Sequence, residues 1–542
     1  MSCFIGVDVG TGSARAGVFD DSGTLLASHK QDIRMWRAAD NIAEQSSDNI
    51  WEAVCACVRT AVQHAGIAPD DVQGIGFDAA CSLVVLDGEM RPLTVSASGE
   101  DARNVIVWMD QRATAQADRI NATGHAVLEF VGGRISPEMQ TPKLLWLKEN
   151  MPQTFAGAGQ FLDLADFLSW SATGSLARSS CTVTCKWTYL AHEDRWDDSY
   201  FNEIGLPELA TEAYARIGQR VVPAGTALAD GLTAQAAERM GLRPGTPVAA
   251  GLIDAHAGGV GTVGADPANG PATTMAYVFG TSACTMASSD QPHKVPGVWG
   301  PYYSAMVPGM WLSEGGQSAA GEAIAHLVQT HPAGADAAVQ AEAAGLSLQA
   351  YLLSLVERRA ADPSEPARLA GARVIVPDFL GNRAPYADPS ATGVVSGLTL
   401  ARDMDDLLCT YVAAVLGVCY GLRQIMQVQS TYGVRPQVIA ISGGAGESPT
   451  IKQLLSDASG VDVIETASPE PVLLGAAMLG AVAGGVHPTI EAAMPAMSSV
   501  KTRFTAATGA LARFHDARFK AFEDLQKVDQ QMRETLSTSA AD

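Results

Sequence analysis

The sequence lacks the long apolar runs and the surplus of basic residues that mark several large classes of protein. Nowhere in its 542 residues does it approach the ~20 uninterrupted apolar residues that a membrane-spanning helix needs. Lys and Arg number 36 against 58 Asp and Glu, which gives a formal net charge of -22. This charge argues against binding to nucleic acid or to anionic membrane surfaces, so we expect neither as a partner.

The cysteines show no disulfide framework. Nine are scattered along the chain, an odd number without the spacing typical of small secreted proteins. Cys181 and Cys185 have no second Cys or His pair nearby in the sequence, which argues against a zinc site. The amino terminus leads straight into an apparent strand, without a basic region or a cleavable apolar segment. We therefore expect free thiols and a cytoplasmic location.

The length and composition predict two large domains. Single hydrophobic cores stop growing at roughly 250 to 300 residues, so 542 residues exceed one core. The apolar fraction of 47% and the charged fraction of 17% are typical of a globular protein. Apolar strand-like runs alternate with amphipathic helical patterns along the chain. We expect two α/β domains, residues 1–262 and 263–542, with a cleft between them.

Two glycine-rich corners, about half the chain apart, have the same layout. Residues 10–13, Gly-Thr-Gly-Ser, and residues 280–282, Gly-Thr-Ser, each follow an apolar run. Such corners expose backbone N–H groups and let a phosphate approach the backbone closely. Neither corner matches the Walker pattern, and the first joins strand to strand, which excludes P-loop and Rossmann folds. With a third Gly-Gly turn at 443–444, they predict a repeated domain that binds a nucleotide.

The hydrophobic periodicity predicts further elements. Helical spacing is found at residues 48–64, 142–150, 335–360, 404–432 and 449–459, and residues 313–328 are interpreted as the start of a helix. Strand-like runs are found at residues 72–79, 83–87, 104–108 and 246–254.

Asp8 and Asp254 each stand at the end of an apolar run. A carboxylate among apolar residues is costly to bury unless something compensates it. Asp8 is interpreted either as a hydrogen-bonded turn residue or as a contact to Mg²⁺ through water. Asp254 is interpreted either as a helix N-cap or as a functional group. The small residues Ala255, Ala257 and Gly258 behind Asp254 leave room for a ligand, which favours function.

Taken together, these features resemble the FGGY family of carbohydrate kinases, within the actin-like ATPase superfamily. The resemblance covers nearly the whole chain and rests on the order and spacing of eight segments. These are residues 6–20, 108–112, 140–147, 251–259, 280–284, 314–321, 381–393 and 442–449. The resemblance implies two actin-like (ribonuclease H-like) domains around a central ATP and sugar cleft. It also implies that ATP and Mg²⁺ serve in phosphorylation of a small sugar or polyol.

The same resemblance implies roles for particular residues. Asp254 would be the general base, and Asp8 and Asp254 would hold Mg²⁺. The sugar would contact Asp78, Ala80, Lys186, Asp254, Glu314 and Gln317. The nucleotide would contact Thr11, Gly12, Ser13, Arg15, Gly280, Thr281, Ser282, Gly321, Asn382, Gly443, Gly444, Ala445 and Ser448. From the residues alone, Lys186 could instead be a solvated surface lysine and Glu314 a helix-start carboxylate.

Two segments bear on the substrate. Residues 78–81, Asp-Ala-Ala-Cys, differ from the Arg-Glu pair of glycerol kinases and the Met-His pair of xylulose kinases. Residues 180–187, SCTVTCKW, resemble the Thr-Cys-Ser-x-x-Cys-Lys-Trp signature of the D-ribulose and ribitol kinase branch, with Ser and Thr exchanged at 180 and 182. We expect D-ribulose, with ribitol, L-ribulose and other pentitols left open. An actin-like ATPase without a sugar acceptor and a sugar-binding regulator without turnover are the alternative classes, and a homodimer is the expected assembly.

Overall fold

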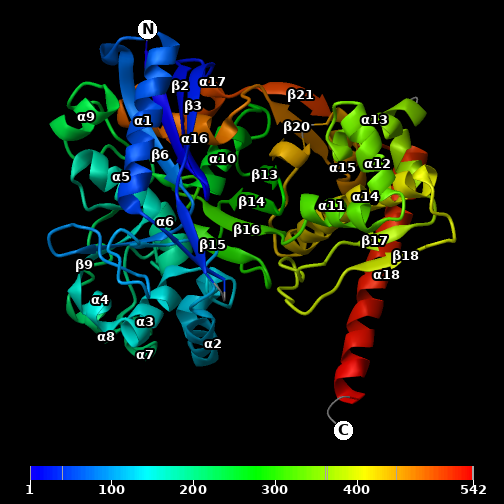
Figure 1. The fold of residues 1–542 in the computed structure, drawn as a ribbon, viewed down its shortest axis with the longest axis horizontal. Coiled ribbons are helices and arrows are strands. Elements are labelled where there is room, and N and C mark those ends of the chain that lie inside the picture. Colours follow the sequence, from blue (N-terminus) through cyan, green and yellow to red (C-terminus); the bar gives the residue numbers. More distant parts are fainter. Residues whose placement is uncertain (1, 39–40, 361, 363, 447, 540–542) are drawn as a thin grey trace.

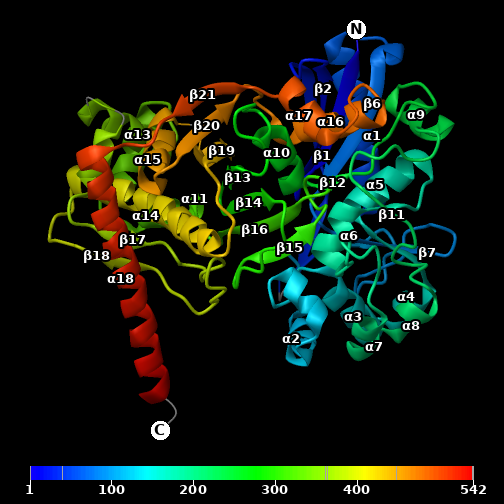
Figure 2. The same ribbon diagram turned by 180° about the vertical axis from the view of Figure 1, so that it is seen from behind.

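The computed structural model describes residues 2–38, 41–360, 362, 364–446 and 448–539. The amino-terminal and carboxyl-terminal halves lie side by side, each built around its own sheet (Figure 1). The last helix, α18 (Gly509–Ser539), leaves the second half and extends away from the body of the molecule in both views (Figures 1 and 2). None of the helices predicted from the sequence corresponds to it.

The first sheet has the strand order β12-β6-β1-β2-β3. Its strands are β1 (Cys3–Val9), β2 (Ser13–Asp20), β3 (Leu25–Asp32), β6 (Val72–Ala79) and β12 (Leu252–Ile253). Strands β1, β2 and β3 form the predicted antiparallel meander, whereas β6 runs parallel to both β1 and β12. The carboxyl ends of three parallel strands therefore meet at one edge, where ligands bind in open α/β sheets.

The second sheet repeats this design with additional strands, in the order β15-β16-β14-β13-β19-β20-β21. Its strands are β13 (Thr274–Phe279), β14 (Ala283–Ser289), β15 (Trp299–Tyr303), β16 (Trp311–Gln317), β19 (Val438–Ser442), β20 (Asp462–Thr466) and β21 (Val500–Phe504). The β13–β14 hairpin carries the second glycine corner, as β1–β2 carries the first, and β19 runs parallel to β13 as β6 does to β1. The predicted internal repeat is confirmed.

Smaller sheets and helices complete the two halves. A third sheet, in the order β4-β5-β8-β7-β9, belongs to the first half. The remaining strands are β4 (Met35–Ala38), β5 (Ile42–Gln45), β7 (Leu83–Asp87), β8 (Val105–Ile106), β9 (Ala158–Asp163), β10 (Arg178–Ser179), β11 (Val221–Val222), β17 (Val374–Val376) and β18 (Val394–Ser396). The helices of the first half are α1 (Ser47–Ala65), α2 (Thr114–Thr123), α3 (Gln140–Asn150), α4 (Pro152–Gly157), α5 (Leu164–Thr173), α6 (Ser180–Trp187), α7 (Asp198–Glu203), α8 (Pro207–Thr211), α9 (Ala234–Met240) and α10 (Asp254–Val263). Those of the second half are α11 (Gly321–Thr330), α12 (Gly334–Ala343), α13 (Leu348–Arg359), α14 (Met404–Thr431), α15 (Pro449–Ser459), α16 (Pro471–Ala483) and α17 (Ile490–Met497).

Helix α16 joins the two halves, because it comes from the second half and packs on β1 and β6 of the first sheet and on α10. Its place beside the first sheet is visible in both views (Figures 1 and 2). Glycines allow the close approach: a Cβ atom on Gly6 would lie 1.8 Å from the Leu473 carbonyl oxygen. A Cβ atom on Gly475 would lie 1.9 Å from the carbonyl oxygen of Ala257. Backbone contact of this kind couples α10, which begins at Asp254, to the second half.

Most predicted helices are confirmed, while four predicted segments differ from the structure. Helices α1, α3, α14 and α15 match the predicted spacing, whereas 335–360 divides into α12 and α13 at the left-handed residue Gly345. The prediction of a helix start at 313–328 is wrong for its first part. Residues Trp311–Gln317 form the buried strand β16, paired with β14, and the helix begins only at Gly321. In 246–254 only Leu252–Ile253 form a strand, and in 104–108 only Val105–Ile106 do so.

Helix α14 is the one described helix that is long and apolar enough, by length and composition, to cross a membrane. In its most apolar window, 83% of the residues are buried inside the protein. The helix packs against α11, α15 and β17. Its apolar composition is therefore explained by its place in the core of the second half.

Candidate active site

A cavity of about 340 Å³ lies where the two halves meet, at the carboxyl edge of the first sheet. Asp8, Ala80 and Asp254 line it from that edge, and Lys186 lines it from α6. The second half contributes Ser282, Cys284, Trp299, Glu314 and Arg383. The cavity thus brings together charged groups from segments that are far apart in the sequence.

Asp254 is the first residue of α10 and not its N-cap, which is Ile253. Its Oδ1 atom accepts a hydrogen bond from the N–H of Ala255, 2.7 Å away. Burial, reinforced by the charge of Asp8, raises the pKa of Asp254 to about 6. A carboxylate with this pKa is largely ionised near neutral pH and more basic than an exposed one, as a proton acceptor should be.

Asp8 and Asp78 stand side by side on the paired strands β1 and β6. Both carboxylates are buried, and neither oxygen of Asp78 has a hydrogen-bond partner among the described residues. Burial and the charge of Asp8 raise the pKa of Asp78 well above its ordinary value. Arg15 forms an ion pair with Asp8, in which its Nε and Nη2 atoms donate to Asp8 Oδ2 at 2.8 Å and 2.5 Å. Asp78 therefore lies behind Asp8 and is not among the residues that line the cavity, where a sugar contact was expected.

Glu314 faces Lys186 across the cavity, and both side chains are less than a tenth exposed. Glu314 accepts a hydrogen bond of 3.1 Å from Nη2 of Arg383, and the guanidinium of Arg383 stacks over the ring of Trp299 at 4.4 Å. The ammonium of Lys186 lies 4.9 Å from the centre of the same ring. Burial alone would raise the pKa of Glu314, but Lys186, His256 and Arg383 hold it well below its usual range. The cavity floor can therefore both donate and accept hydrogen bonds.

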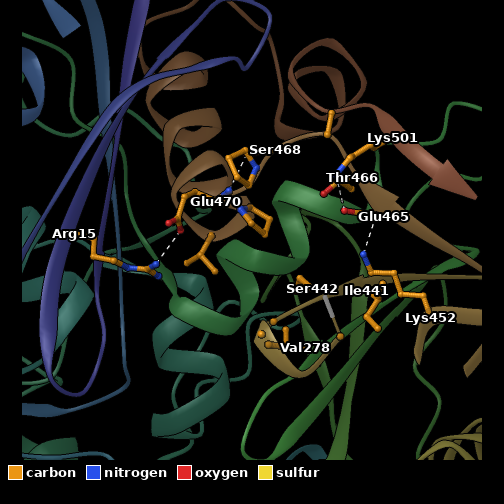
Figure 3. Close-up of a pocket in the computed structure, with 17 residues that line it drawn as sticks. Arg15, Val278, Ile441, Ser442, Lys452, Glu465, Thr466, Ser468, Glu470 and Lys501 are labelled. Atoms are coloured by element: carbon orange, nitrogen blue, oxygen red, sulfur yellow. Dashed lines mark hydrogen bonds and ion pairs between the residues drawn. The ribbon is translucent and has the colours of Figure 1, made fainter. Parts of the chain in front are cut away.

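A second cavity, of about 490 Å³, is lined by the Gly-Gly turn after β19 and by the start of α16 (Figure 3). Gly443 and Gly444 lie on one side of it, and Arg15 reaches it from the first half, where Nη1 lies 2.9 Å from Glu470 Oε2. Glu465 accepts from Lys452 at 2.8 Å and from Lys501 at 3.0 Å. The first and second cavities share Arg15, Val278 and Val472. A molecule long enough to occupy the second cavity could therefore reach the first.

The two glycine corners have matching hydrogen bonds, with the N–H of Gly10 donating to Ser13 and that of Gly280 to Ser282. Thr11 lines the first cavity, where its hydroxyl accepts a hydrogen bond from the indole of Trp108. Ser282 lines the same cavity from the opposite side. Gly12, Thr281 and Ser282 are exposed, as groups that receive a ligand must be. Gly321 donates its N–H to the carbonyl of Gly280 and so supports the second corner.

Several expected contacts line neither cavity: Asp78, Gln317, Asn382 and Ser448, and the residues Gly12, Ser13, Gly280, Thr281 and Gly321 at the glycine corners. Gln317 lies three positions after Glu314 on β16, so the alternation of a strand turns it to the opposite face. There it bonds with Tyr277 and with the carbonyl of Val418. Asn382 bonds with Asp378 in the region beside α18, and Ser448 is the N-cap of α15. The side chain of Ala445 lies outside the described residues.

Three groups at or behind the first cavity were not predicted from the sequence. Arg383 immediately follows Asn382, and it is Arg383 that reaches Glu314. Its position in the conspicuous Pro- and Gly-rich loop was the available signal. Trp299 lies in a strand that no pattern singled out. His256, two residues after Asp254, is buried 3.5 Å from Glu314 and was passed over as part of a small-residue helix.

The comparisons with known proteins agree with this geometry. The model of the FGGY family of carbohydrate kinases, N-terminal domain, matches residues 3–261, and the model of its C-terminal domain matches residues 275–484. The chain belongs to the FGGY family of carbohydrate kinases. The domain boundary near residue 262 stays a prediction.

Individual relatives of this FGGY chain extend over most of its length. It is 47% identical over 510 residues to a human FGGY carbohydrate kinase domain-containing protein, covering 92% of this chain and 91% of that one. It is 37% identical over 514 residues to a D-ribulokinase of Saccharomyces cerevisiae, covering 89% of this chain and 72% of the yeast protein. A xylulose kinase structure from Rhodospirillum rubrum shares the fold, with a TM-score of 0.80 at 22% identity over 98% and 99% of the two chains. The protein is an ATP-dependent sugar kinase with the two-domain actin-like fold.

Proposed function

We propose that this FGGY kinase transfers the γ-phosphate of ATP to the terminal hydroxyl of a pentulose, D-ribulose in the first place, giving the 5-phosphate. The observation that carries the proposal is the convergence of Asp254, Lys186 and Glu314 in one cavity. That cavity shares Arg15 and Val278 with the cavity of the Gly-Gly turn. A sugar in the first cavity and a nucleotide in the second would meet at this boundary.

The proposed step needs one proton acceptor and a fixed geometry. Asp254 takes the proton of the terminal hydroxyl as its oxygen forms a bond to the γ-phosphorus, and the bond from that phosphorus to ADP breaks. Lys186 donates to sugar oxygens, including a ketose carbonyl, while Glu314 accepts from hydroxyls on the other side. Phosphoryl transfer depends mainly on positioning and charge neutralisation, so a cleft between two phosphate-binding corners suits it.

The carboxylates of the first cavity fit a Mg²⁺ ion that is bound by the protein and the nucleotide together. Among the described residues there is no group of three or more His, Cys, Asp and Glu that could hold a metal by themselves. Mg²⁺ is commonly bound through one or two carboxylates, water and substrate phosphates. Asp8 and Asp254, which line the first cavity, would supply those carboxylates. When bound, the ion would neutralise charge that develops on the transferred phosphate.

The preference for D-ribulose rests on two observations. Residues 180–187 resemble the signature of the D-ribulose and ribitol branch, with Ser and Thr exchanged at 180 and 182. They form α6, with Lys186 at the cavity. The yeast relative named D-ribulokinase is aligned over 89% of this chain. Ribitol differs from D-ribulose by reduction of the carbonyl, other pentitols differ also in the placement of hydroxyls, and L-ribulose is the mirror image of D-ribulose. These compounds remain the alternatives.

A panel assay tests the proposal. ADP release at saturating MgATP is measured with each of five compounds as the acceptor: D-ribulose, L-ribulose, ribitol, xylulose and glycerol. We expect the highest kcat/KM with D-ribulose. Highest activity with glycerol or xylulose would overturn the substrate, whereas ADP release that no sugar stimulates would favour an actin-like ATPase. Sugar binding without any ADP release would favour a regulator. The cytoplasmic location and the homodimer are further proposals, tested by cell fractionation and by light scattering.

A further inference from the structure

Trp299 lies directly opposite Glu314 in the second sheet. The two residues are paired across the antiparallel strands β15 and β16, so their side chains lie on the same face of the sheet. Both line the first cavity. The pairing of the strands shifts register between Trp299 and Tyr302, and an irregularity of this kind can re-aim a side chain beside an active site. The indole of Trp299 therefore belongs to the wall of the first cavity.

A backbone contact from the first half holds the start of β15. The N–H of Gly132 donates to the carbonyl of Gly300 at 3.0 Å. A Cβ atom on Gly132 would lie 2.8 Å from the carbonyl oxygen of Val298 and 3.2 Å from Cα of Trp299. Gly132 has a φ of +81°, a conformation that glycine adopts without steric cost. The backbone at Trp299 is thus packed closely against the first half.

Two cations from different halves contact the ring of Trp299. The Nζ atom of Lys186, on α6, lies 4.9 Å from the centre of the ring, and the Cζ atom of Arg383 lies 4.4 Å from it. A cation within about 6 Å of a ring is attracted to it, most strongly when the ring is that of tryptophan. Because the two cations repel each other, a ring that attracts both favours one fixed arrangement of the pair.

Both cations have donors left for a ligand. The guanidinium of Arg383 has five N–H donors, and its contacts to Glu314 Oε1 at 3.1 Å and to Cys284 Sγ at 3.6 Å come from two different nitrogen atoms. The ammonium of Lys186 has three donors. Both side chains line the first cavity. Donors from both halves therefore face one ligand site, with Trp299 between them and the sheet.

A ketose carbonyl and a polyol hydroxyl use such donors differently. A carbonyl oxygen only accepts hydrogen bonds, and it prefers donors near the plane of the C=O group. A hydroxyl both donates and accepts, and its hydrogen rotates to suit its neighbours. A donor that is held in one place therefore favours a carbonyl, whereas a hydroxyl also adapts to a donor that is loosely held.

We propose that Trp299 is a positioning residue that holds Lys186 and Arg383 so that they donate to neighbouring oxygens of the sugar, the ketose carbonyl among them. This makes Arg383 a further sugar contact, and it gives the site its selectivity for a ketose over a pentitol. The inference rests on the proposed function, because it takes the substrate to be a ketose bound in the first cavity.

Calorimetric titration with D-ribulose and with ribitol tests the proposal, because the two compounds differ only at the carbonyl carbon. Trp299→Leu removes the aromatic face and keeps an apolar side chain. We expect the ratio of the dissociation constant of ribitol to that of D-ribulose to fall about ten-fold, the lower end of the effect of one charged hydrogen bond. Trp299→Phe keeps an aromatic face, so it should keep most of the selectivity. The KM for ATP should change less than about three-fold in both variants.

Trp36→Leu is the matched control, because Trp36 also contacts two cations, Arg34 at 4.4 Å and Arg103 at 5.4 Å, but lines neither cavity. We expect the wild-type ratio in this variant. Arg383→Lys decides the question if Trp299→Leu does not fold, since it leaves the ring in place and removes the planar fork of donors. The ratio should fall in the same way.

An unchanged ratio in folded Trp299→Leu or in Arg383→Lys, or an equal loss of affinity for both compounds, would overturn the inference. Absence of sugar-dependent ADP release in the wild type would instead overturn the proposed function.

Discussion

The buried position of Asp254 predicts a specific pH dependence of catalysis. A base must be deprotonated to act, and burial together with Asp8 raises the pKa of Asp254 to about 6. With that pKa the ionised fraction is about 90% at pH 7 and about 10% at pH 5. The kcat/KM for sugar, which reports the free enzyme, should therefore fall about ten-fold between these pH values. An exposed aspartate, with a pKa of about 3.9, would produce almost no change over the same interval.

The assay must separate this ionisation from that of the nucleotide. ADP should be measured directly after quenching, because coupling enzymes have pH profiles of their own, and the dissociation constant of MgATP should be measured at each pH. Asp8→Asn removes one of the charges that raise the pKa of Asp254, so the ascending limb should move to lower pH. A level profile from about pH 7 to about pH 5, after correction for MgATP binding, would refute the assignment of Asp254 as a base with a pKa near 6.

Three further substitutions have expected outcomes. Lys186→Met should raise the KM for the ketose and leave the KM for ATP unchanged, because Lys186 lines the sugar cavity and not the cavity of the Gly-Gly turn. An unchanged KM for the ketose would exclude a contact between Lys186 and the sugar. Gly475→Ala should lower the free energy of unfolding by about 1–3 kcal/mol, since its Cβ would meet a backbone oxygen of α10 at 1.9 Å. Both stabilities are measured by denaturant unfolding, with Gly88→Ala as the control, because a Cβ atom on Gly88 has no neighbour within 4 Å. Equal stability of the two variants would contradict the close packing at Gly475. Arg533→Met removes an ion pair and a hydrogen bond that join α18 to the loop that carries Arg383. We therefore expect a higher KM for the sugar with unchanged ATP affinity. Unchanged kinetics would show that α18 does not support the loop.

The sequence predicted features that depend on local pattern. The strand–glycine–strand corners, the long apolar helix α14 and the carboxylates at strand ends are all encoded in neighbouring residues. Strand β16 was misread because Glu314, Gly315 and Gly316 have low strand propensity. Strand β16 is extended because it pairs with β14 on one side and β15 on the other. The local sequence pattern contains no information on these pairings.

Contacts between distant segments could not be predicted from the local sequence pattern. Gln317 and Asn382 were selected for their polar side chains, yet the strand alternation of β16 and the loop beside α18 turn them away from the cavities. Arg383 and His256 meet Glu314 only because the chain folds segments 58 or more residues distant onto β16. Asp78 shows the same limit, since its burial behind Asp8 depends on the register of two strands.

Asp254→Asn tests the central claim most directly. Asparagine keeps the size of the side chain and can accept the N–H of Ala255, but it cannot take a proton. Sugar-dependent ADP release should fall about one-hundred-fold to ten-thousand-fold, the usual contribution of a general base. The dissociation constant of MgATP should change far less, because Asp8 and the phosphates of the nucleotide would still hold the ion. Turnover near the wild-type rate in a variant that binds MgATP normally would contradict the account.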